Sequence, residues 1–341
     1  MKLNLNQIKN ITQGAVNVFE KDGYFEFHRF TTEQEDLYSN PTLKRPLTVG
    51  HLKVLTSAGV KLRFLTNSNT LAFTAKFING TYREIYSIDV FVNGEFFNTI
   101  CSHESIPESY DKGIEEKEVT KSYNFESGEK EISIYLPFST ITLLKDFCLD
   151  DNSIVKPIKP SKKLLAFGDS ITHGYDCLHS HKSYINLVAT ALDYEVYNKA
   201  IGGERFFPEF ALCSDGFTPD LITIAYGTND WSNNNTKPND LISSSSQFIG
   251  NLRKVYKSSK IVVIGPIWRK DLEEEKPCGK FRDVAKMLEA QTKKFENVYF
   301  IDGFNFVPHD PIYYGDRRLH PNDKGFEHYA KNLLIELNKI L

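Results

Sequence analysis

Two residues of this chain, Ser170 and His320, are of the types that nucleophilic catalysis combines. A serine hydroxyl is a poor nucleophile until a base beside it takes its proton. A histidine imidazole titrates near neutral pH and suits that task. Ser170 lies in the segment GDSIT (168–172) and His320 lies in RLHPND (318–323), so the function depends on whether the fold brings the two together.

Two further segments place polar or backbone groups directly after apolar runs. A glycine pair that ends in Gly203 follows the run VYNKAI (196–201), and the segment GTND (227–230), which contains Asn229, follows another apolar run. With the serine and histidine segments, these make four candidate parts of one site.

The apolar pattern of the C-terminal half predicts the strands and helices that position these segments. Five continuous apolar runs predict strands that are covered on both faces, at residues 164–167, 196–201, 221–227, 261–267 and 298–303. Apolar residues at spacings of three and four predict helices at residues 183–192, 241–259, 281–295 and 325–341. Alternating strands and helices predict a three-layer α/β domain with a parallel sheet. Ligands bind at the carboxyl ends of such strands, where the polar segments lie.

The N-terminal half has a different pattern. Apolar and polar residues alternate in short runs, which predict half-buried strands at residues 23–30, 61–67, 71–77, 87–94 and 131–138. Many short strands without a long helical pattern predict an all-β sandwich, with a jelly roll as one form of it. The segment KPIKPSKK (156–163) is typical of a linker, so we expect a sandwich domain at residues 1–155 and the α/β domain at residues 162–341.

Composition excludes several classes of function. The 341 residues carry a net charge of −3, which lacks the basic excess of a nucleic-acid-binding protein or a polybasic membrane patch. No stretch approaches the roughly 20 apolar residues of a membrane span, and the N-terminus carries no signal-like apolar run, so the sequence predicts a cytoplasmic protein. The five scattered cysteines predict reduced thiols.

Taken in order, four features of the sequence resemble the SGNH or GDSL hydrolase family: GDSIT (168–172), Asn198 five residues before Gly203, GTND (227–230) and HPNDKGF (320–326). The resemblance covers roughly residues 162–341. It implies a flavodoxin-like hydrolase domain that cleaves carboxylic esters. It also implies that no metal or cofactor is needed, in agreement with the absence of metal-ligand spacing in the sequence.

The resemblance implies a role for each residue. Ser170 would attack the ester carbonyl, and His320 would take the serine proton and later deliver it to the leaving alkoxide. The backbone N–H groups of Ser170 and Gly203 and the side-chain amide of Asn229 would form the oxyanion hole, where losing one donor costs about 3 kcal/mol. Gly203 suits this role because the missing Cβ allows a close backbone approach.

One departure from the family pattern concerns the residue that orients His320. The family usually has an aspartate three residues before the histidine, and Arg317 occupies that position here. Asp316, four residues before, reaches His320 only if the loop has a bulge. The alternative is a backbone carbonyl that orients His320 in a Ser-His dyad, as in some carbohydrate acetylesterases.

Three further residues are candidates for substrate binding, and the two tryptophans among them have a structural alternative. Asp169 lies beside Ser170, and Trp231 and Trp268 follow strand ends, where their rings would stack on a sugar or pack in the core. Ser170 itself would by type alone be a helix N-cap, and we expect Asp230 to support its loop.

The predicted function is therefore a serine esterase that removes a short acyl group, such as acetyl, from a carbohydrate-like alcohol. A lipase or thioesterase using the same residues is the first alternative. The second is a carbohydrate-binding protein with a degenerate hydrolase domain. The predicted partner is a small-molecule or carbohydrate ester rather than a nucleic acid or membrane, and the sequence is compatible with a homo-oligomer without indicating one.

Overall fold

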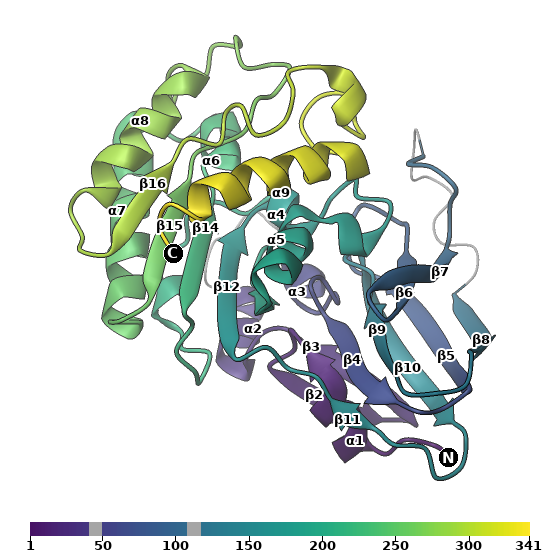
Figure 1. The fold of residues 1–341 in the computed structure, drawn as a ribbon. Helices are drawn as coiled ribbons and strands as arrows, with labels where there is room; N and C mark the ends of the chain where they lie inside the picture. The colour runs from purple at the N-terminus through teal and green to yellow at the C-terminus, as the bar shows by residue number, and fades with distance from the viewer. Residues whose placement is uncertain (41–49, 108–116) are drawn as a thin grey trace.

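The computed structural model describes residues 1–40, 50–107 and 117–341, and its C-terminal part is built around one parallel sheet (Figure 1). The strands are β12 (Lys162–Gly168), β13 (Tyr194–Asn198), β14 (Leu221–Ala225), β15 (Lys260–Ile264) and β16 (Val298–Ile301). They lie in the order β13-β12-β14-β15-β16, which is 2-1-3-4-5 in chain order. This is a flavodoxin-like order, as the family resemblance implies, and its switch point lies between β12 and β14.

Helices cover both faces of this sheet because its strands present apolar side chains on both sides. Leu164 of β12 packs with α5 (Tyr184–Leu192) and α9 (Asp323–Leu337) on one face. The next residue, Leu165, packs on the other face with α7 (Pro238–Val255) and α8 (Phe281–Thr292). Shorter helical segments are α4 (Ser170–His173), α6 (Thr228–Ser232), η1 (Ser180–Lys182), η2 (Phe210–Leu212) and η3 (Pro311–Tyr313).

The N-terminal part is a β-sandwich of two antiparallel sheets. One sheet has the order β1-β4-β9-β6-β7, with β11 paired to β4, and the other has the order β2-β3-β10-β5-β8. The two sheets share one apolar core that includes Phe64 and Phe73. The strands are β1 (Thr12–Gln13), β2 (Asn17–Lys21), β3 (Tyr24–His28), β4 (Lys61–Thr66), β5 (Thr70–Asn79), β6 (Ser87–Val92), β7 (Glu95–Cys101), β8 (Glu118–Asn124), β9 (Lys130–Tyr135), β10 (Thr140–Leu149) and β11 (Lys156–Pro157).

The sequence missed several elements of the sandwich for local reasons. Strands β7 and β8 are mostly exposed, so they lack a clear apolar face. The helices α1 (Leu5–Ile11), α2 (Thr32–Ser39) and α3 (Gly50–Val54) are too short to show a helical period. Part of the predicted linker is a strand, since β11 pairs with β4. The jelly-roll connectivity and the domain division at residues 155–162 stay predictions.

The sandwich and the α/β part meet through closely approaching backbone. The Gly14 N–H donates to the buried Glu195 carboxylate at 3.3 Å. A Cβ added at Gly59, which has a φ of +80°, would lie only 2.8 Å from the Cβ of Asn198. The end of β13 is therefore packed against the sandwich. Over the described residues, no helix combines the length and the apolar character that crossing a membrane requires.

Candidate active site

Ser170 is the first residue of α4, the short helix that follows the end of β12. The preceding Asp169 caps this helix, and its Oδ1 accepts the Ile171 N–H at 2.9 Å. The first N–H groups of a helix have no acceptor within the helix, so the Ser170 N–H is available to a bound group. Burial raises the pKa of the Asp169 carboxyl to about 6.

A loop at the chain end, residues 314–322 (the histidine loop), brings His320 to Ser170. His320 Nε2 lies 2.8 Å from Ser170 Oγ, and His320 Nδ1 lies 2.7 Å from Asp316 Oδ2. When the Nδ1 proton is donated to the carboxylate, Nε2 is left as an acceptor for the serine proton. The structure thus brings Ser170, His320 and Asp316 together in one chain of contacts.

The bulge that lets Asp316 reach His320 lies at Arg317. This residue has a φ of +58°, a left-handed conformation that is uncommon for a residue other than glycine. Asp316 Oδ1 stabilises the bulge by accepting the backbone N–H groups of Arg318, Leu319 and His320 at 2.9, 2.7 and 3.1 Å. Burial opposes ionisation of Asp316, but the bonds from His320 and the backbone outweigh it and hold its pKa well below the usual value. Asp316 therefore faces His320 as a carboxylate.

The second loop beside Ser170, residues 198–204 (the glycine loop), contains Gly203. Asn198 Nδ2 donates to the Thr172 carbonyl of α4 at 2.9 Å, and the Ile201 N–H donates to the Gly168 carbonyl of β12 at 3.1 Å. These two bonds tie the loop to the strand and helix that flank Ser170. Gly203 has a φ of +85° and is exposed, whereas Gly202 is buried. The only exposed residue of this loop is thus the predicted oxyanion donor.

Asn229 lies on α6, which follows the end of β14. Its Nδ2 donates one hydrogen to the Glu204 carbonyl of the glycine loop at 3.0 Å. An amide nitrogen carries two hydrogens, so the second remains for a bound group. The neighbouring Asp230 supports the same region, because its Oδ1 accepts the Phe206 N–H at 3.3 Å. Burial raises the pKa of Asp230 to about 7.

Two charged residues beside His320 were not predicted from the sequence. Asp176 is 1 % exposed, and its Oδ2 lies 3.8 Å from His320 Nδ1. Arg83 of the sandwich binds Asp176 through Nε at 2.5 Å, and its Nη2 lies 3.3 Å from His320 Nδ1. Asp176 follows the GDSIT segment closely, which is the one signal that points to it, while nothing in the sequence around Arg83 does.

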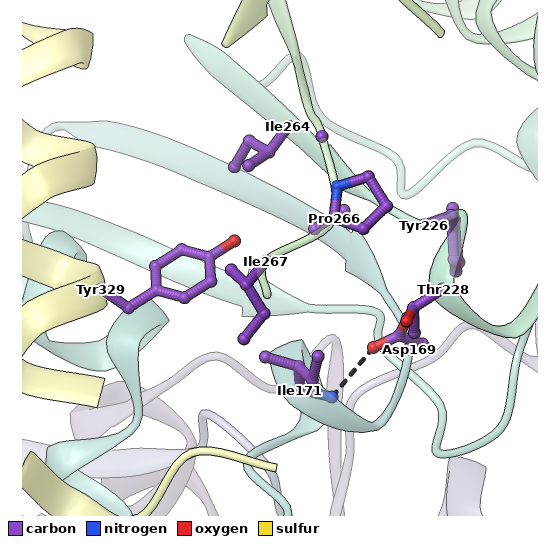
Figure 2. Close-up of a pocket in the computed structure, with 10 residues that line it drawn as sticks. Asp169, Ile171, Tyr226, Thr228, Ile264, Pro266, Ile267 and Tyr329 are labelled. Carbon is purple, nitrogen blue, oxygen red and sulfur yellow. Dashed lines mark hydrogen bonds between the residues drawn. The ribbon is translucent and has the colours of Figure 1, made fainter. Parts of the chain in front are cut away.

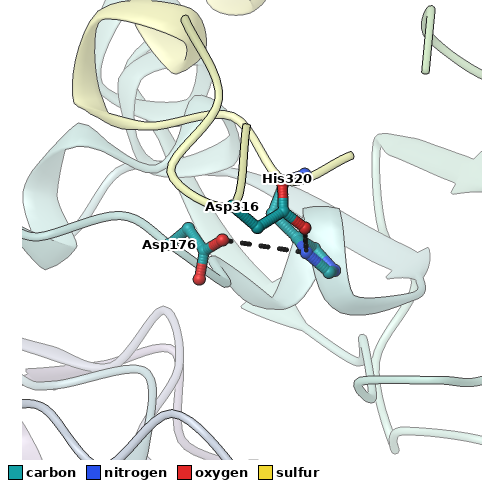
Figure 3. Close-up of side chains that lie close together, drawn as sticks. All are labelled: Asp176, Asp316 and His320. Carbon is teal, nitrogen blue, oxygen red and sulfur yellow. Dashed lines mark hydrogen bonds and ion pairs between the residues drawn. The ribbon is translucent and has the colours of Figure 1, made fainter. Parts of the chain in front are cut away.

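Asp176, Asp316 and His320 form the one group of possible metal ligands found among residues 1–40, 50–107 and 117–341, with ligand atoms within 4.8 Å of one another (Figure 3). Their other contacts do not favour a metal ion. Asp176 is already paired with the positively charged guanidinium of Arg83. The His320 Nδ1 atom, which a metal would need, is occupied by Asp316.

Two of the three candidate substrate-binding residues are buried in the structure. Trp231 is fully buried, its indole N–H donates to the Gly279 carbonyl at 2.8 Å, and its ring packs against Phe281. It is therefore a core residue. Asp169 is 2 % exposed, and its carboxylate caps α4 through Oδ1.

Trp268 differs from these two because it is only partly buried. Its ring stacks on His309, with centroids 5.6 Å apart, and lies 5.2 Å from the ring of Tyr314 in the histidine loop. The structure keeps Trp268 as a candidate for contact with a sugar ring.

A small cavity of about 20 Å³ lies beside α4 (Figure 2). Its walls come from the ends of β14 and β15, from Asp169 and Ile171, and from Tyr329 of α9. Ser170 is not part of its lining, although both of its neighbours are. The cavity is thus next to the nucleophile rather than over it.

Residues 166–328 match the GDSL-like lipase/acylhydrolase family. No curated protein sequence matches the chain at a significant level.

Three solved structures are similar over nearly the whole chain. A salicylyl-acyltransferase, SsfX3, from a tetracycline biosynthetic pathway has a TM-score of 0.78 and 20 % identity, covering 96 % of this chain and 94 % of its own. A putative GDSL-like lipase from Bacteroides ovatus has a TM-score of 0.74 and 19 % identity, covering 98 % and 96 %. A family two carbohydrate esterase from Cellvibrio japonicus has a TM-score of 0.65 and 18 % identity, covering 98 % and 96 %. At these identities the likeness establishes the fold, with the sandwich included.

Proposed function

We propose that the chain is an ester hydrolase that acts through an acyl-enzyme on Ser170, in keeping with the match of residues 166–328 to the GDSL-like lipase/acylhydrolase family. The observation that carries this proposal is the contact chain from Ser170 Oγ through His320 to Asp316, at 2.8 and 2.7 Å. Both distances are those of hydrogen bonds: the first can pass the serine proton to His320, and the second orients the imidazole and stabilises its charged form.

The reaction follows from these contacts. His320 Nε2 takes the Ser170 proton while Oγ attacks the ester carbonyl, and the resulting imidazolium is stabilised by the Asp316 carboxylate. The imidazolium then gives its proton to the leaving alkoxide, and the acyl group remains on Oγ. A water molecule, activated by the same imidazole, releases the acid in the second half of the reaction.

The oxyanion of each tetrahedral intermediate needs fixed donors. The Ser170 N–H at the start of α4, the Gly203 N–H and the second Asn229 N–H come from three strand ends that meet at this edge of the sheet. Each donor belongs to an element whose position is held by hydrogen bonds, so little reorganisation is needed when the charge develops.

For the substrate we propose a short-chain ester, with an O-acetyl group on a carbohydrate as the first candidate. The similarity to the carbohydrate esterase from Cellvibrio japonicus supports this class. The partly exposed ring of Trp268, close to the histidine loop, supports a sugar as the alcohol, since aromatic rings stack on the apolar faces of sugars. A cytoplasmic location remains part of the proposal.

A second candidate is transfer of the acyl group to an alcohol other than water. It is favoured by the similarity to the salicylyl-acyltransferase over 96 % of the chain. The same acyl-enzyme would serve both reactions, and they differ only in which nucleophile receives the acyl group. Adding simple alcohols to the assay and measuring the new ester against the free acid separates the two.

The direct test is hydrolysis of p-nitrophenyl acetate and of longer nitrophenyl esters by the wild type and Ser170→Ala. We expect the wild type to prefer the shortest acyl group and Ser170→Ala to lose at least about 1,000-fold in kcat. Ser243→Ala, which removes a hydroxyl from α7 on another part of the molecule, should match the wild type. Equal turnover by the wild type and Ser170→Ala would overturn the proposal.

A further inference from the structure

One peptide group of the glycine loop is held by a cation from the N-terminal sandwich. Lys53 Nζ donates to the Gly202 carbonyl oxygen at 2.8 Å, although the two residues are 149 positions apart. The N–H of that same planar peptide group belongs to Gly203, the proposed oxyanion donor. Lys53 therefore contacts the donor group from its carbonyl side.

Arg29 fixes Lys53 relative to the glycine loop. Its guanidinium is fully buried, and it donates from Nη2 to the Lys53 carbonyl at 2.8 Å and from Nη1 to the Ala200 carbonyl at 3.3 Å. One planar group thus spans α3 of the sandwich and the loop. The distance between the Lys53 backbone and the peptide that its side chain binds is set by this bridge.

A neutral histidine holds the other side of Gly202. The Gly202 N–H donates to His173 Nδ1 at 3.1 Å, and His173 Nε2 lies 3.0 Å from the Phe138 carbonyl of the sandwich, so the ring proton lies on Nε2. Burial, with the charge of Arg29 second, holds the pKa of His173 well below its usual value. His173 therefore helps to fix the position of Gly202 without placing a charge beside it.

We propose that Lys53 is a positioning residue of the active site, whose ammonium holds and polarises the peptide between Gly202 and Gly203 and so makes the Gly203 N–H a fixed and stronger oxyanion donor. The inference rests on the proposed esterase function. A cation on the carbonyl oxygen draws electron density from the amide nitrogen, and hydrogen bonds in such a chain strengthen one another. Lys53 is 2 % exposed, so water screens this effect weakly.

The same burial makes the effect depend on pH. Burial lowers the pKa of Lys53 from 10.5, and the charge of Glu204 opposes this only partly. The other groups that face this region are the Tyr82 ring, 4.9 Å from Nζ, the cationic Arg29, the neutral His173 and, on the adjacent α2, Glu35 paired with His28. As pH rises through the lowered pKa the ammonium is lost, so kcat should fall at a pH below that of an ordinary lysine.

The test compares Lys53→Met, which removes the charge, with Lys53→Arg, which keeps it. Lys121→Met on the exposed strand β8 serves as the matched control. For each protein, kcat and KM for p-nitrophenyl acetate are measured between about pH 6 and 10, together with thermal unfolding. We expect Lys53→Met to lose roughly 10- to 100-fold in kcat with KM nearly unchanged.

Two features of the pH profile separate positioning from a merely structural role. The alkaline fall of kcat should be absent in Lys53→Met, and in Lys53→Arg it should move to higher pH with part of the activity restored. A folded Lys53→Met with wild-type kcat, or a Lys53→Arg whose alkaline fall stays at the wild-type pH, would overturn the inference. The second result decides the question even if Lys53→Met does not fold. Activity retained in Ser170→Ala would instead overturn the proposed function.

Discussion

The two loops that flank Ser170 are held in opposite ways. The histidine loop is organised locally, because Asp316 binds three backbone N–H groups and the His320 ring within five residues. The glycine loop is organised from a distance by Arg29 and Lys53 of the sandwich. The first loop is largely exposed in its centre, and the second is buried except at Gly203.

This difference shows what the sandwich contributes to the active site. His320 and its carboxylate partner Asp316 come from one loop of the α/β part, with Arg83 of the sandwich beside them. The backbone of the glycine loop, in contrast, is bound by two cations of the sandwich. Lys199 of this loop is itself buried and donates to the Gln34 side chain of the sandwich at 3.0 Å. The sandwich is therefore part of the active-site framework rather than only a neighbouring module. The predictions below test each side of the contrast.

The largest effect is expected from the histidine loop. Asp316→Ala removes both the partner of His320 and the acceptor of the bulge, and Asp316→Asn keeps the acceptor but loses the charge. Both should lower kcat by roughly 100- to 10,000-fold, because the imidazolium loses its partner. Thermal unfolding should separate them, with only Asp316→Ala losing stability. Wild-type kcat in Asp316→Asn would favour the dyad alternative.

Arg29→Met tests the glycine loop. Removing the guanidinium takes a donor from the Thr56, Asn198 and Ala200 carbonyls in a buried site. We expect the free energy of unfolding to fall by about 3–5 kcal/mol, measured by urea denaturation. Lys121→Met should leave it unchanged. A loss no larger than that of the control would show that the sandwich does not hold this loop.

A smaller effect is expected where the sandwich touches the start of the glycine loop. Gly59→Ala would place a Cβ 2.8 Å from the Asn198 Cβ, and Gly94→Ala changes a glycine with nearly the same φ, +82° against +80°, that has no atom within 4 Å. In both variants, alanine at this positive φ should lower the free energy of unfolding, measured by urea denaturation, by about 1 kcal/mol. Gly59→Ala should lower it by about a further 1–2 kcal/mol because the added Cβ overpacks the contact. Equal losses in the two variants would contradict the close contact.

The smallest effect concerns the outer side of the histidine loop. Arg318 pairs with Asp271 at 2.6 Å, and Asp271 also binds the buried Arg269 at 2.6 Å. Arg269 in turn donates to the Ser232 hydroxyl of α6, the helix of Asn229. Arg318 is 55 % exposed, so Arg318→Met should lower kcat only about twofold. A loss above tenfold would mean that this loop, too, depends on distant contacts.

The contrast between the loops also explains how far the sequence could predict the site. Ser170, His320 and Asn229 follow strands or precede a helix that the apolar pattern predicts, so their meeting follows from the topology of a parallel sheet. The group that orients His320 could be given only as two alternatives, Asp316 or a backbone carbonyl. The bulge that brings Asp316 to His320 depends on the left-handed conformation of Arg317, which no sequence pattern predicts.

The residues that the sequence missed act over long distances. Lys53 and Arg29 bind backbone carbonyls, which every residue has, so no complementary residue marks the partner. Arg83 reaches Asp176 from a segment without a motif. Trp231 could be given only as two alternatives, because a position after a strand end does not tell whether the ring turns into the core, as it does here. The strands, the helices and the segments that follow them could thus be predicted from the sequence, whereas the contacts between the two parts of the chain could not.

The central claim is that Ser170 carries the acyl group, and trapping that intermediate tests it most directly. The wild type is mixed with excess p-nitrophenyl acetate, quenched in acid within the first turnovers and analysed by mass spectrometry of the intact protein and its peptides. The account predicts one acetyl group on the peptide that contains Ser170, and none in Ser170→Ala. An acetyl group on another residue, or equal labelling of Ser170→Ala, would contradict it.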